Sequence, residues 1–339
     1  MKEKANKDMF SPLFQGNFGK NTNKYYGLMY QNRATNQLSQ ISTKRNPTKE
    51  IPYTNTLRLV YEDLTVDIEN KVKIGPAESM MLDYIIFRHT QDDNHDNNFS
   101  VVISLKEYMQ DRGLKDSKSA RAFLKREKDI MTAIHVSYDS ENDNNPYDQS
   151  FTMNLFSSAS WDKGKVIFNL TPEFNTILTQ HGQAMPYFKE LFKLNPYKGE
   201  NANKIGKWLQ YSKFMNYNKP GDRENRAKIS TLLSNCPSIP SYNYVMKHGK
   251  HVNQLIIQPF LDAIEQLAHL KMFTYRLCYD REGKKEFNYT NGLSYEDFSK
   301  GYLIITSWNS YLDEYVKRIA ERRNKYRNKA RKRKQHKKK

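Results

Sequence analysis

Few side chains in this sequence have the spacing of catalytic residues or metal ligands. The two that come nearest to a metal-binding pair are His248 and His251. Two residues separate them, one of which is a glycine, and the glutamate of a zinc-binding helix is missing. Tyr244 and Lys247 have a spacing found in nucleases with a tyrosine nucleophile, but those nucleases also need two histidines flanking one bulky residue. The chain also lacks a Walker phosphate loop, a dinucleotide glycine fingerprint and a cluster of paired carboxylates. We therefore expect no catalytic residues, no metal and no cofactor, and a protein that binds its target and is not an enzyme.

The charge of the chain indicates a polyanionic partner. The net charge is +18 and the pI is about 9.5. Residues 321–339 hold twelve Lys and Arg against one Glu, a net charge of +11, which leaves +7 for the rest of the chain. A basic body with a basic tail is typical of nucleic-acid binding. An anionic membrane surface, or charge that only maintains solubility, are the alternatives.

Cysteine usage and hydropathy favour a cytoplasmic protein with no membrane contact. Cys236 and Cys278 are far apart and match no metal spacing, so we expect two reduced core residues. No apolar run approaches the roughly 18 to 20 residues that span a bilayer. The N-terminal lysines are not followed by the apolar stretch of a signal peptide.

The chain divides by composition into four parts. Residues 1–52 are polar and lack periodicity, so we expect a mostly disordered arm. Residues 53–182 and 183–319 each repeat one order of elements: a helix, a second helix, and a strand hairpin. Residues 320–339 form a polybasic tail that is too charged to pack. The predicted fold class is α+β, with two winged helix-turn-helix domains in tandem.

The first of these domains should start with a strand over 57–68 and a helix opened by Gly75-Pro76. Ser104 and Glu107 have capping-box spacing, so a helix begins there and ends near Gly113. A further helix follows over 117–132, apolar on one side and basic on another. Its cations recur about one turn apart, as a helix that follows phosphates needs. They are Lys118, Arg121, Lys125 and Lys128.

Hairpins after this helix are predicted to be the wings. Segments 135–138 and 151–156 alternate as strands around an acidic loop, and a third strand over 165–170 follows the turn that contains Lys163. The acidic loop should avoid phosphate, whereas Lys163 can contact it. Thr171-Pro172 then starts a helix that extends to about residue 180.

The second domain contains the helix that we expect to recognise bases. Helices are predicted over 202–217 and from 229 to Cys236-Pro237, followed by a long helix over 251–271. Pro259 lies inside the long helix and removes a backbone donor, so we expect a kink or a break there. Its first turns are rich in amides, which can pair with adenine. The candidates for base contact are Lys250, His251, Asn253, Gln254 and Gln258.

A strand over 272–279 and a basic turn complete this domain. The cations of the turn, expected to bind phosphate, are Arg281, Lys284 and Lys285. Strands over 287–289 and 302–306 should return along the sheet. A helical apolar stripe from Trp308 to Ile319 should then pack on the second domain.

The segment from Ile229 to Tyr279 resembles the C-terminal domain of bacterial plasmid replication initiators of the double winged-helix, iteron-binding kind. The resemblance is carried by the short helix Ile229-Ser-Thr-Leu-Leu-Ser-Asn235, the segment Phe260-Leu-Asp-Ala-Ile-Glu-Gln-Leu267 and the strand Met272-Phe-Thr-Tyr-Arg-Leu277. Segment 104–138 resembles the N-terminal winged helix of the same family. The resemblance implies binding to repeated sites at an origin, homodimerisation through the N-terminal domain, and recruitment of a host helicase.

The predicted function is therefore sequence-specific binding of double-stranded DNA to initiate plasmid replication. Arg121 and Lys125 are further candidates for base contact. A transcription regulator with the same fold, a nicking or relaxase-type nuclease, and an RNA-binding or ribosome-associated protein remain alternatives.

Overall fold

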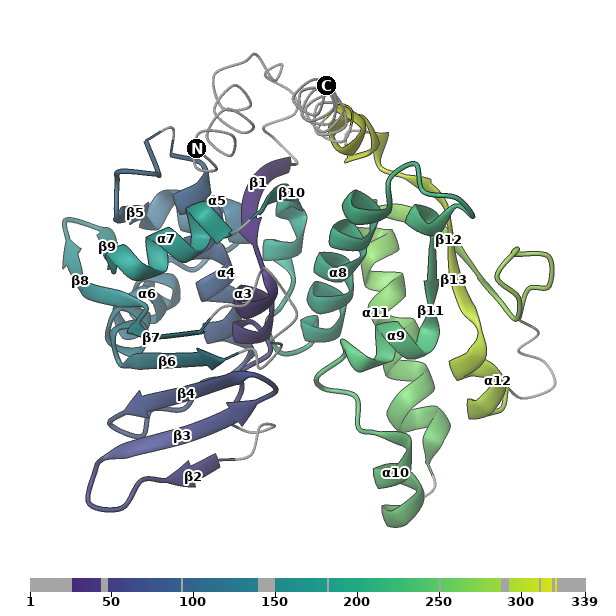
Figure 1. The fold of residues 1–339 in the computed structure, drawn as a ribbon, viewed down its shortest axis with the longest axis horizontal. Helices are drawn as coiled ribbons and strands as arrows, with labels where there is room; N and C mark the ends of the chain where they lie inside the picture. Colours follow the sequence, from purple (N-terminus) through teal and green to yellow (C-terminus); the bar gives the residue numbers. More distant parts are fainter. Residues whose placement is uncertain are drawn as a thin grey trace, which may run out of the picture. The chain divides into compact units, whose positions relative to one another are not determined.

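The structure, a computed structural model, describes residues 26–321 except 44–47, 93, 140–149, 182, 250, 288–292, 311 and 319–320. Most of the expected tail, the first 25 residues of the expected arm and most of the acidic loop lie outside the described residues. The chain forms two compact units, Leu28–Met185 and the part from Pro186 onward. Both mix helices with antiparallel sheets, as the predicted α+β class requires (Figure 1).

The first unit contains a winged helix, which we call the first winged helix. Its elements follow the order helix, strand, helix, helix and hairpin. They are α4 (Pro76–Thr90), β5 (Ser100–Ser104), α5 (Leu105–Arg112), α6 (Ser117–Thr132), β8 (Phe156–Asp162) and β9 (Lys165–Leu170). The three strands form an antiparallel sheet in the order β5-β9-β8. The Ser104 hydroxyl accepts the Glu107 N–H at 3.2 Å, and Gly113 ends α5 in the left-handed region, so the predicted limits of this helix are confirmed.

A five-stranded sheet in the same unit corrects two expectations. Its order is β2-β3-β4-β6-β7. The strands are β2 (Thr48–Glu50), β3 (Thr56–Tyr61), β4 (Leu64–Glu69), β6 (Ile134–Asp139) and β7 (Ser150–Asn154). The single strand expected over 57–68 is a hairpin that turns at Glu62, whose φ is 51°. The hairpin after α6 is not a wing, because β6 pairs with β4 and both bury alternate residues in the same core.

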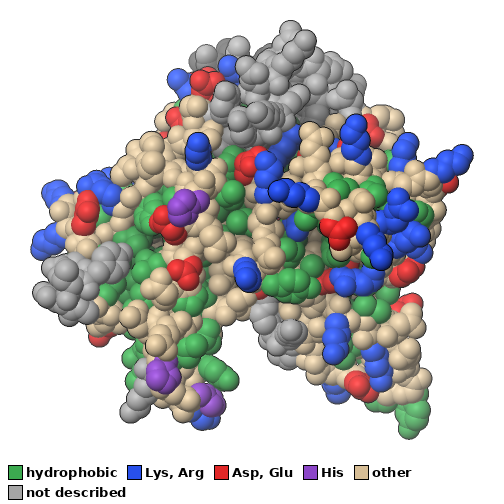
Figure 2. All heavy atoms as spheres, turned by 180° about the vertical axis from the view of Figure 1, so that it is seen from behind, with side chains coloured by type: hydrophobic (Ala, Val, Ile, Leu, Met, Phe, Trp, Pro, Cys, Tyr) green, Lys and Arg blue, Asp and Glu red, His purple; other side chains and the backbone are tan. Residues whose placement is uncertain are grey.

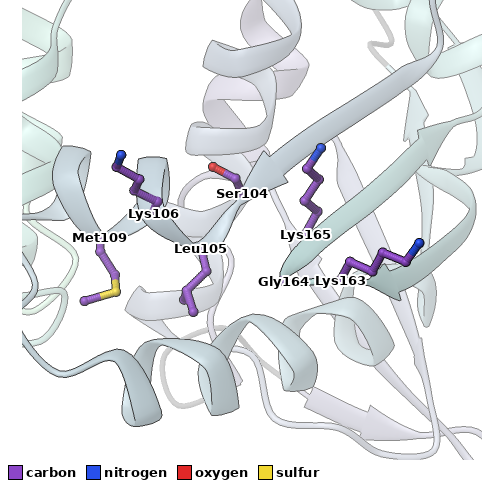
Figure 3. A pocket seen from close by; sticks show the side chains of 7 residues that line it. All are labelled: Ser104, Leu105, Lys106, Met109, Lys163, Gly164 and Lys165. Carbon is purple, nitrogen blue, oxygen red and sulfur yellow. The ribbon is translucent and has the colours of Figure 1, made fainter.

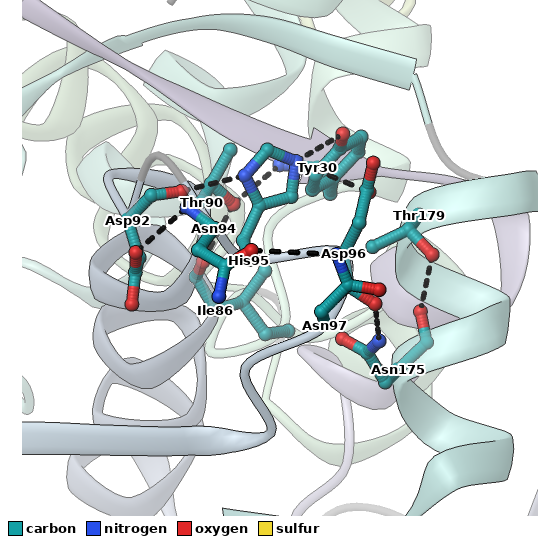
Figure 4. Close-up of polar contacts among 10 residues, drawn as sticks. All are labelled: Tyr30, Ile86, Thr90, Asp92, Asn94, His95, Asp96, Asn97, Asn175 and Thr179. Carbon is teal, nitrogen blue, oxygen red and sulfur yellow. Dashed lines mark hydrogen bonds and ion pairs between the residues drawn. The ribbon is translucent and has the colours of Figure 1, made fainter. Parts of the chain in front are cut away.

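The expectation of a disordered arm does not hold for residues 26–43. Strand β1 (Tyr26–Gln31) pairs with β10 (Gln183–Phe188), and α3 (Arg33–Leu38) follows it. Met29 is fully buried. The Tyr30 N–H donates to the Thr90 hydroxyl at 3.2 Å, and the Tyr30 hydroxyl lies 2.8 Å from His95 Nε2, as Figure 4 shows. Burial and then the charge of Asp96 raise the pKa of Tyr30. Apolar burial and polar contacts that sequence periodicity does not reveal therefore fix this segment.

The core of the first winged helix contains a buried carboxylate pair. Glu127 of α6 is fully buried and lies near Glu78 of α4, which is 6% exposed. The Arg126 guanidinium bridges them, at 2.6 Å from Glu78 Oε1 and 2.9 Å from Glu127 Oε1. Burial and the Glu78 charge raise the pKa of Glu127 to about 8, although Arg126 opposes this. Glu127 is therefore protonated more readily in the folded protein than in the unfolded chain.

Replacement Glu127→Gln should change how stability depends on pH. Because the folded-state pKa is raised, the stability contributed by the protonated form is fully present below the unfolded value of 4.5 and is lost as pH rises through about 8. The wild type should lose about 1.4 kcal/mol per pH unit within this window, and the variant should not. Urea unfolding of both proteins from pH 5 to pH 9 measures the slope. Asp129→Asn, on the exposed side of α6, is the control and should keep the wild-type slope. An unchanged slope in Glu127→Gln would mean that Glu127 is ionised in the folded state.

The second unit repeats the same order and contains the second winged helix. Along the chain, the second winged helix is preceded by helix α7 (Pro172–His181), β10 and a 3-10 turn η1 (Lys189–Lys193). Its elements are α8 (Glu200–Asn216), η2 (Arg223–Asn225), β11 (Arg226–Lys228), α9 (Ile229–Ser234), α10 (Tyr242–His248), η3 (Asn253–Ile257), α11 (Gln258–His269), β12 (Phe273–Cys278), α12 (Tyr295–Lys300) and β13 (Tyr302–Trp308). The antiparallel sheet order is β11-β13-β12, which matches β5-β9-β8 of the first winged helix position by position.

Equivalent glycines show how closely the two winged helices correspond. The Leu105 N–H at the start of α5 donates to the Gly164 carbonyl at 2.9 Å, directly before β9. The Ile229 N–H at the start of α9 donates to the Gly301 carbonyl at 2.9 Å, directly before β13. The same backbone bond therefore joins the second helix of each domain to its last strand. The predicted tandem arrangement is confirmed at this level of detail.

The long helix of the second winged helix is continuous but changes its winding before Pro259. Residues of η3 form a π-helical turn, and the Gln258 N–H bonds to the Asn253 carbonyl, five residues back. Pro259 is at the first turn of α11 and has no N–H to donate. The irregularity expected at Pro259 is therefore present as a π turn and not as a break.

Apolar packing fixes the inner face of this helix. Phe260, Ile264 and Leu267 are fully buried, as their helical spacing predicts. Gly206 of α8 faces Leu267, and a Cβ at this glycine would lie 2.9 Å from Leu267 Cδ2. Helix α8 can therefore approach α11 closely. Leu312 and Tyr315 of the expected C-terminal stripe are also buried, as is Val316. Asp313 pairs with Lys213 of α8 at 2.7 Å, so the predicted docking is confirmed.

Candidate nucleic-acid interface

Helix α6 presents a cationic face. Lys118, Arg121 and Lys125 are exposed at i, i+3 and i+7, so they lie on one side about a turn apart. Figure 2 shows Lys and Arg side chains gathered on the part of the first winged helix that contains α6. The helix starts at Asp116, whose carboxylate accepts the Lys118 N–H at 2.9 Å. The Ser119 hydroxyl and the Lys118 N–H lower the pKa of this carboxyl.

Neighbouring side chains decide which cations of α6 are available to a ligand. Lys125 Nζ lies 5.5 Å from the ring centroid of Trp161 in β8, a cation–π contact that holds it beside the hairpin. Lys128, in contrast, is only half-exposed and pairs with Asp129 at 2.5 Å. Arg126 is exposed, but Glu78 and Glu127 engage its charge. Lys118, Arg121 and Lys125 are therefore the most available of the four predicted α6 cations, and Lys128 is the least available.

The wing of the first winged helix is the short hairpin β8–β9. Lys163 and Gly164 connect the strands with φ values of 44° and 82°, a two-residue turn of the primed type. This turn and the start of α5 line a surface pocket of about 480 Å³ that is open to solvent. Lysines dominate its polar lining (Figure 3); they are Lys106, Lys163 and Lys165. Lys106 was not among the candidates from the sequence. Its position in the first turn of α5, two residues after the cap Ser104, could have indicated an exposed lysine beside the wing.

The long helix formed by η3 and α11 is the helix expected to contact bases, and we call it the second recognition helix. Its exposed side carries amides. His251, Asn253, Gln254 and Gln258 are all exposed, and Lys250 lies outside the described residues. Gln258 Nε2 donates to Asp262 Oδ1 at 2.8 Å, which orients the amide and leaves its oxygen available. Asp262 and Glu265 follow on the exposed surface of α11, so acidic side chains come after the amides along the helix. This polarity suits contact between its first turns and base edges.

The wing of the second winged helix is basic but not a simple hairpin. Asp280 accepts the backbone N–H groups of Lys284 at 3.1 Å and Lys285 at 2.7 Å, which fixes the turn and lowers the Asp280 pKa. Arg281, Lys284 and Lys285 are exposed, as predicted. The strand expected over 287–289 lies largely outside the described residues. Helix α12 follows, which the sequence analysis did not predict, and β13 then pairs with β12, as expected for the strand over 302–306.

Of the two histidines considered for metal binding, one has other contacts and one is exposed. His248 Nδ1 lies 2.8 Å from the Tyr244 carbonyl, and its ring stacks on the Tyr244 ring with centroids 4.2 Å apart. His251 is exposed one residue before the long helix continues. Within the described residues, no three His, Cys, Asp or Glu side chains come together as metal ligands. The part of the chain that the structure describes also has no helix of the length and hydropathy needed to span a bilayer.

Two winged helices, each with an exposed helix beside a basic turn, define a winged-helix DNA-binding protein. Residues 62–195 match the family model described as "Initiator Replication protein, WH1". The match starts just before β4 and ends after η1, so it includes the complete first winged helix. This part of the chain therefore matches the N-terminal winged-helix domain of replication initiators, in agreement with the resemblance stated from the sequence.

Solved structures with a similar fold include crystal structures of domains 2 and 3 of RctB. One aligns over 80% of this chain and 98% of that chain, with 12% identity and a TM-score of 0.43. A second aligns over 79% of this chain and 92% of that chain, with 11% identity and a TM-score of 0.37. The search of curated proteins found no match.

Proposed function

We propose that this protein binds repeated double-stranded sites at the replication origin of a plasmid or similar element and thereby initiates replication. The observation that supports this most is the pair of complementary surfaces on two equivalent domains. The first winged helix offers cations, which bind phosphates without regard to sequence. The second offers amides, which distinguish adenine from the other bases in the major groove. The family match of residues 62–195 adds the replication role.

The proposal assigns roles to particular residues. Asn253, Gln254 and Gln258, together with His251 and Lys250, contact bases. Arg121 and Lys125 lie where they can contact either bases or backbone. The remaining cations anchor the duplex through its phosphates; they are Lys118, Lys128, Lys163, Arg281, Lys284 and Lys285. The protein acts on DNA in the cytosol by binding and not by bond-making, as a homodimer or a monomer that recruits a host helicase.

Footprinting on DNA that flanks the protein's own gene tests the proposal. We expect protection of several spaced, similar sequences. A single protected site at a promoter, with no effect on replication of a test plasmid, would instead support a transcription regulator. Incubation of supercoiled DNA with Mg²⁺ or Mn²⁺ tests the nuclease alternative. Nicking that disappears in Tyr244→Phe would overturn the binding-only assignment.

The cationic face of α6 gives a quantitative expectation for salt. With about six phosphate contacts, affinity should fall ~10³-fold between 50 and 200 mM salt. Replacement Lys118→Ala should reduce the slope of log K against log salt by about 0.9 and should weaken binding to specific and random duplexes alike. Fluorescence anisotropy at several salt concentrations measures both. Lys71→Ala, which removes an exposed lysine paired with Glu50, is the control and should leave the slope unchanged.

A further inference from the structure

The π turn η3 gives the second recognition helix an unusual exposed surface. In an α-helix, Asn253 would lie on the same side as Ile256, three residues later. Ile256 is 1% exposed, yet Asn253 is exposed. The wider π turn therefore rotates Asn253 outward, and three consecutive residues, Asn253 to Leu255, face solvent before the buried pair Ile256 and Ile257.

One member of this exposed run is apolar. Leu255 is 43% exposed, although it lies within a helix that has a well-formed apolar core side. Its exposed neighbours along the helix are His251 and three uncharged amides, Asn253, Gln254 and Gln258. The first acidic residue, Asp262, comes seven positions later, two turns along the helix. Leu255 is thus an apolar group within the part of the surface that the proposed function assigns to base contact.

The major groove offers one apolar group to such a side chain. Thymine carries a C5-methyl group there, and apolar contact with this methyl is a recurrent means of recognising thymine. Amides beside it suit the adenine edge of the same or the next base pair. We propose that Leu255 is a specificity-determining residue that contacts a thymine methyl group. It thereby selects an A·T pair at the position that it contacts. This inference rests on the proposed function, because it requires that η3 enters the major groove.

Deoxyuridine provides a direct test, because it differs from thymidine by the loss of the methyl group alone. A duplex is first selected with the full-length protein from a randomised double-stranded library. Each thymine of that duplex is then replaced by deoxyuridine in turn. We expect one or two replacements to lower wild-type affinity about 5-fold, the effect of losing one or two buried methyl contacts. Leu255→Ala should bind the thymine duplex about 5-fold more weakly and should not distinguish it from the uracil duplex at those positions.

Val60→Ala is the matched control, because Val60 is 48% exposed but lies on β3, outside both winged helices. It should retain the wild-type preference for thymine. Thermal unfolding establishes that Leu255→Ala is folded, and its affinity for a random duplex should stay at the wild-type value. The inference is overturned if no thymine shows a methyl effect, or if Leu255→Ala keeps the effect. Failure to select any preferred duplex would instead contradict the proposed function itself.

Discussion

Alanine at Asn253, Gln254 and Gln258 together should abolish most sequence preference while leaving non-specific DNA binding intact. A bidentate amide–adenine pair contributes about 1–3 kcal/mol of discrimination. Even at the lower figure, three such contacts amount to about 3 kcal/mol, or about 100-fold in affinity for the selected duplex. Affinity for a random duplex should change less than about 3-fold, because the cations of α6 and of both wings are untouched.

Competition binding with the selected and the random duplex measures this difference in one experiment. The three amides are exposed and alanine favours helix, so the fold should be retained. Gln110→Ala removes an exposed helical amide of the first winged helix and serves as the control; it should keep full preference for the selected duplex. Equal losses on both duplexes would show that the amide surface supports general binding, and would move base recognition to α6.

Short-range rules predicted the helices well because each helix carries its own signals. Ser104, Glu107 and Gly113 marked the limits of α5, and the apolar spacing in 117–132 defined α6. Pro259 marked the place where the long helix changes winding, although the sequence did not reveal a π turn. The exposed cations and amides were predicted for the same reason, since a polar residue opposite an apolar stripe is almost always on the surface.

Long-range pairing was not predictable in this way. The sequence shows that β6 and β7 are strands, but not that β4 is the partner of β6, so this hairpin was assigned to a wing. Strand β8 has the sequence Phe-Ser-Ser-Ala-Ser-Trp-Asp, which lacks regular apolar alternation, because its pairing with β9 and not its own burial fixes it. The same limit applies to the site. Leu255 was not among the candidates, because the sequence analysis sought base contacts only among polar side chains.

Gly301→Ala should destabilise the second winged helix more than any other single methyl addition at a glycine with ordinary backbone angles. Gly301 has φ −71°, so the cost is steric and not conformational. A Cβ would overlap the Phe287 ring and lie 2.9 Å from the Cys278 carbonyl oxygen. Phe287 is itself buried and contacts Phe298, with ring centroids 6.0 Å apart, so it has little room to move. Overpacking of this kind typically costs 1–3 kcal/mol, and we expect about 3 kcal/mol here.

Displacement of Gly301 should also weaken its carbonyl bond to the Ile229 N–H, which joins α9 to β13. Urea unfolding gives the free-energy change, and hydrogen–deuterium exchange localises it to β11–β13 and α9, with the first winged helix unaffected. Gly249→Ala is the control: its φ of 175° lies outside the left-handed region that favours glycine, and the added Cβ would meet only His251 Cδ2, at 3.4 Å. That change should alter stability by less than about 0.5 kcal/mol. If Gly301→Ala unfolds at the wild-type urea concentration, the close contact between Gly301 and Phe287 does not exist in solution.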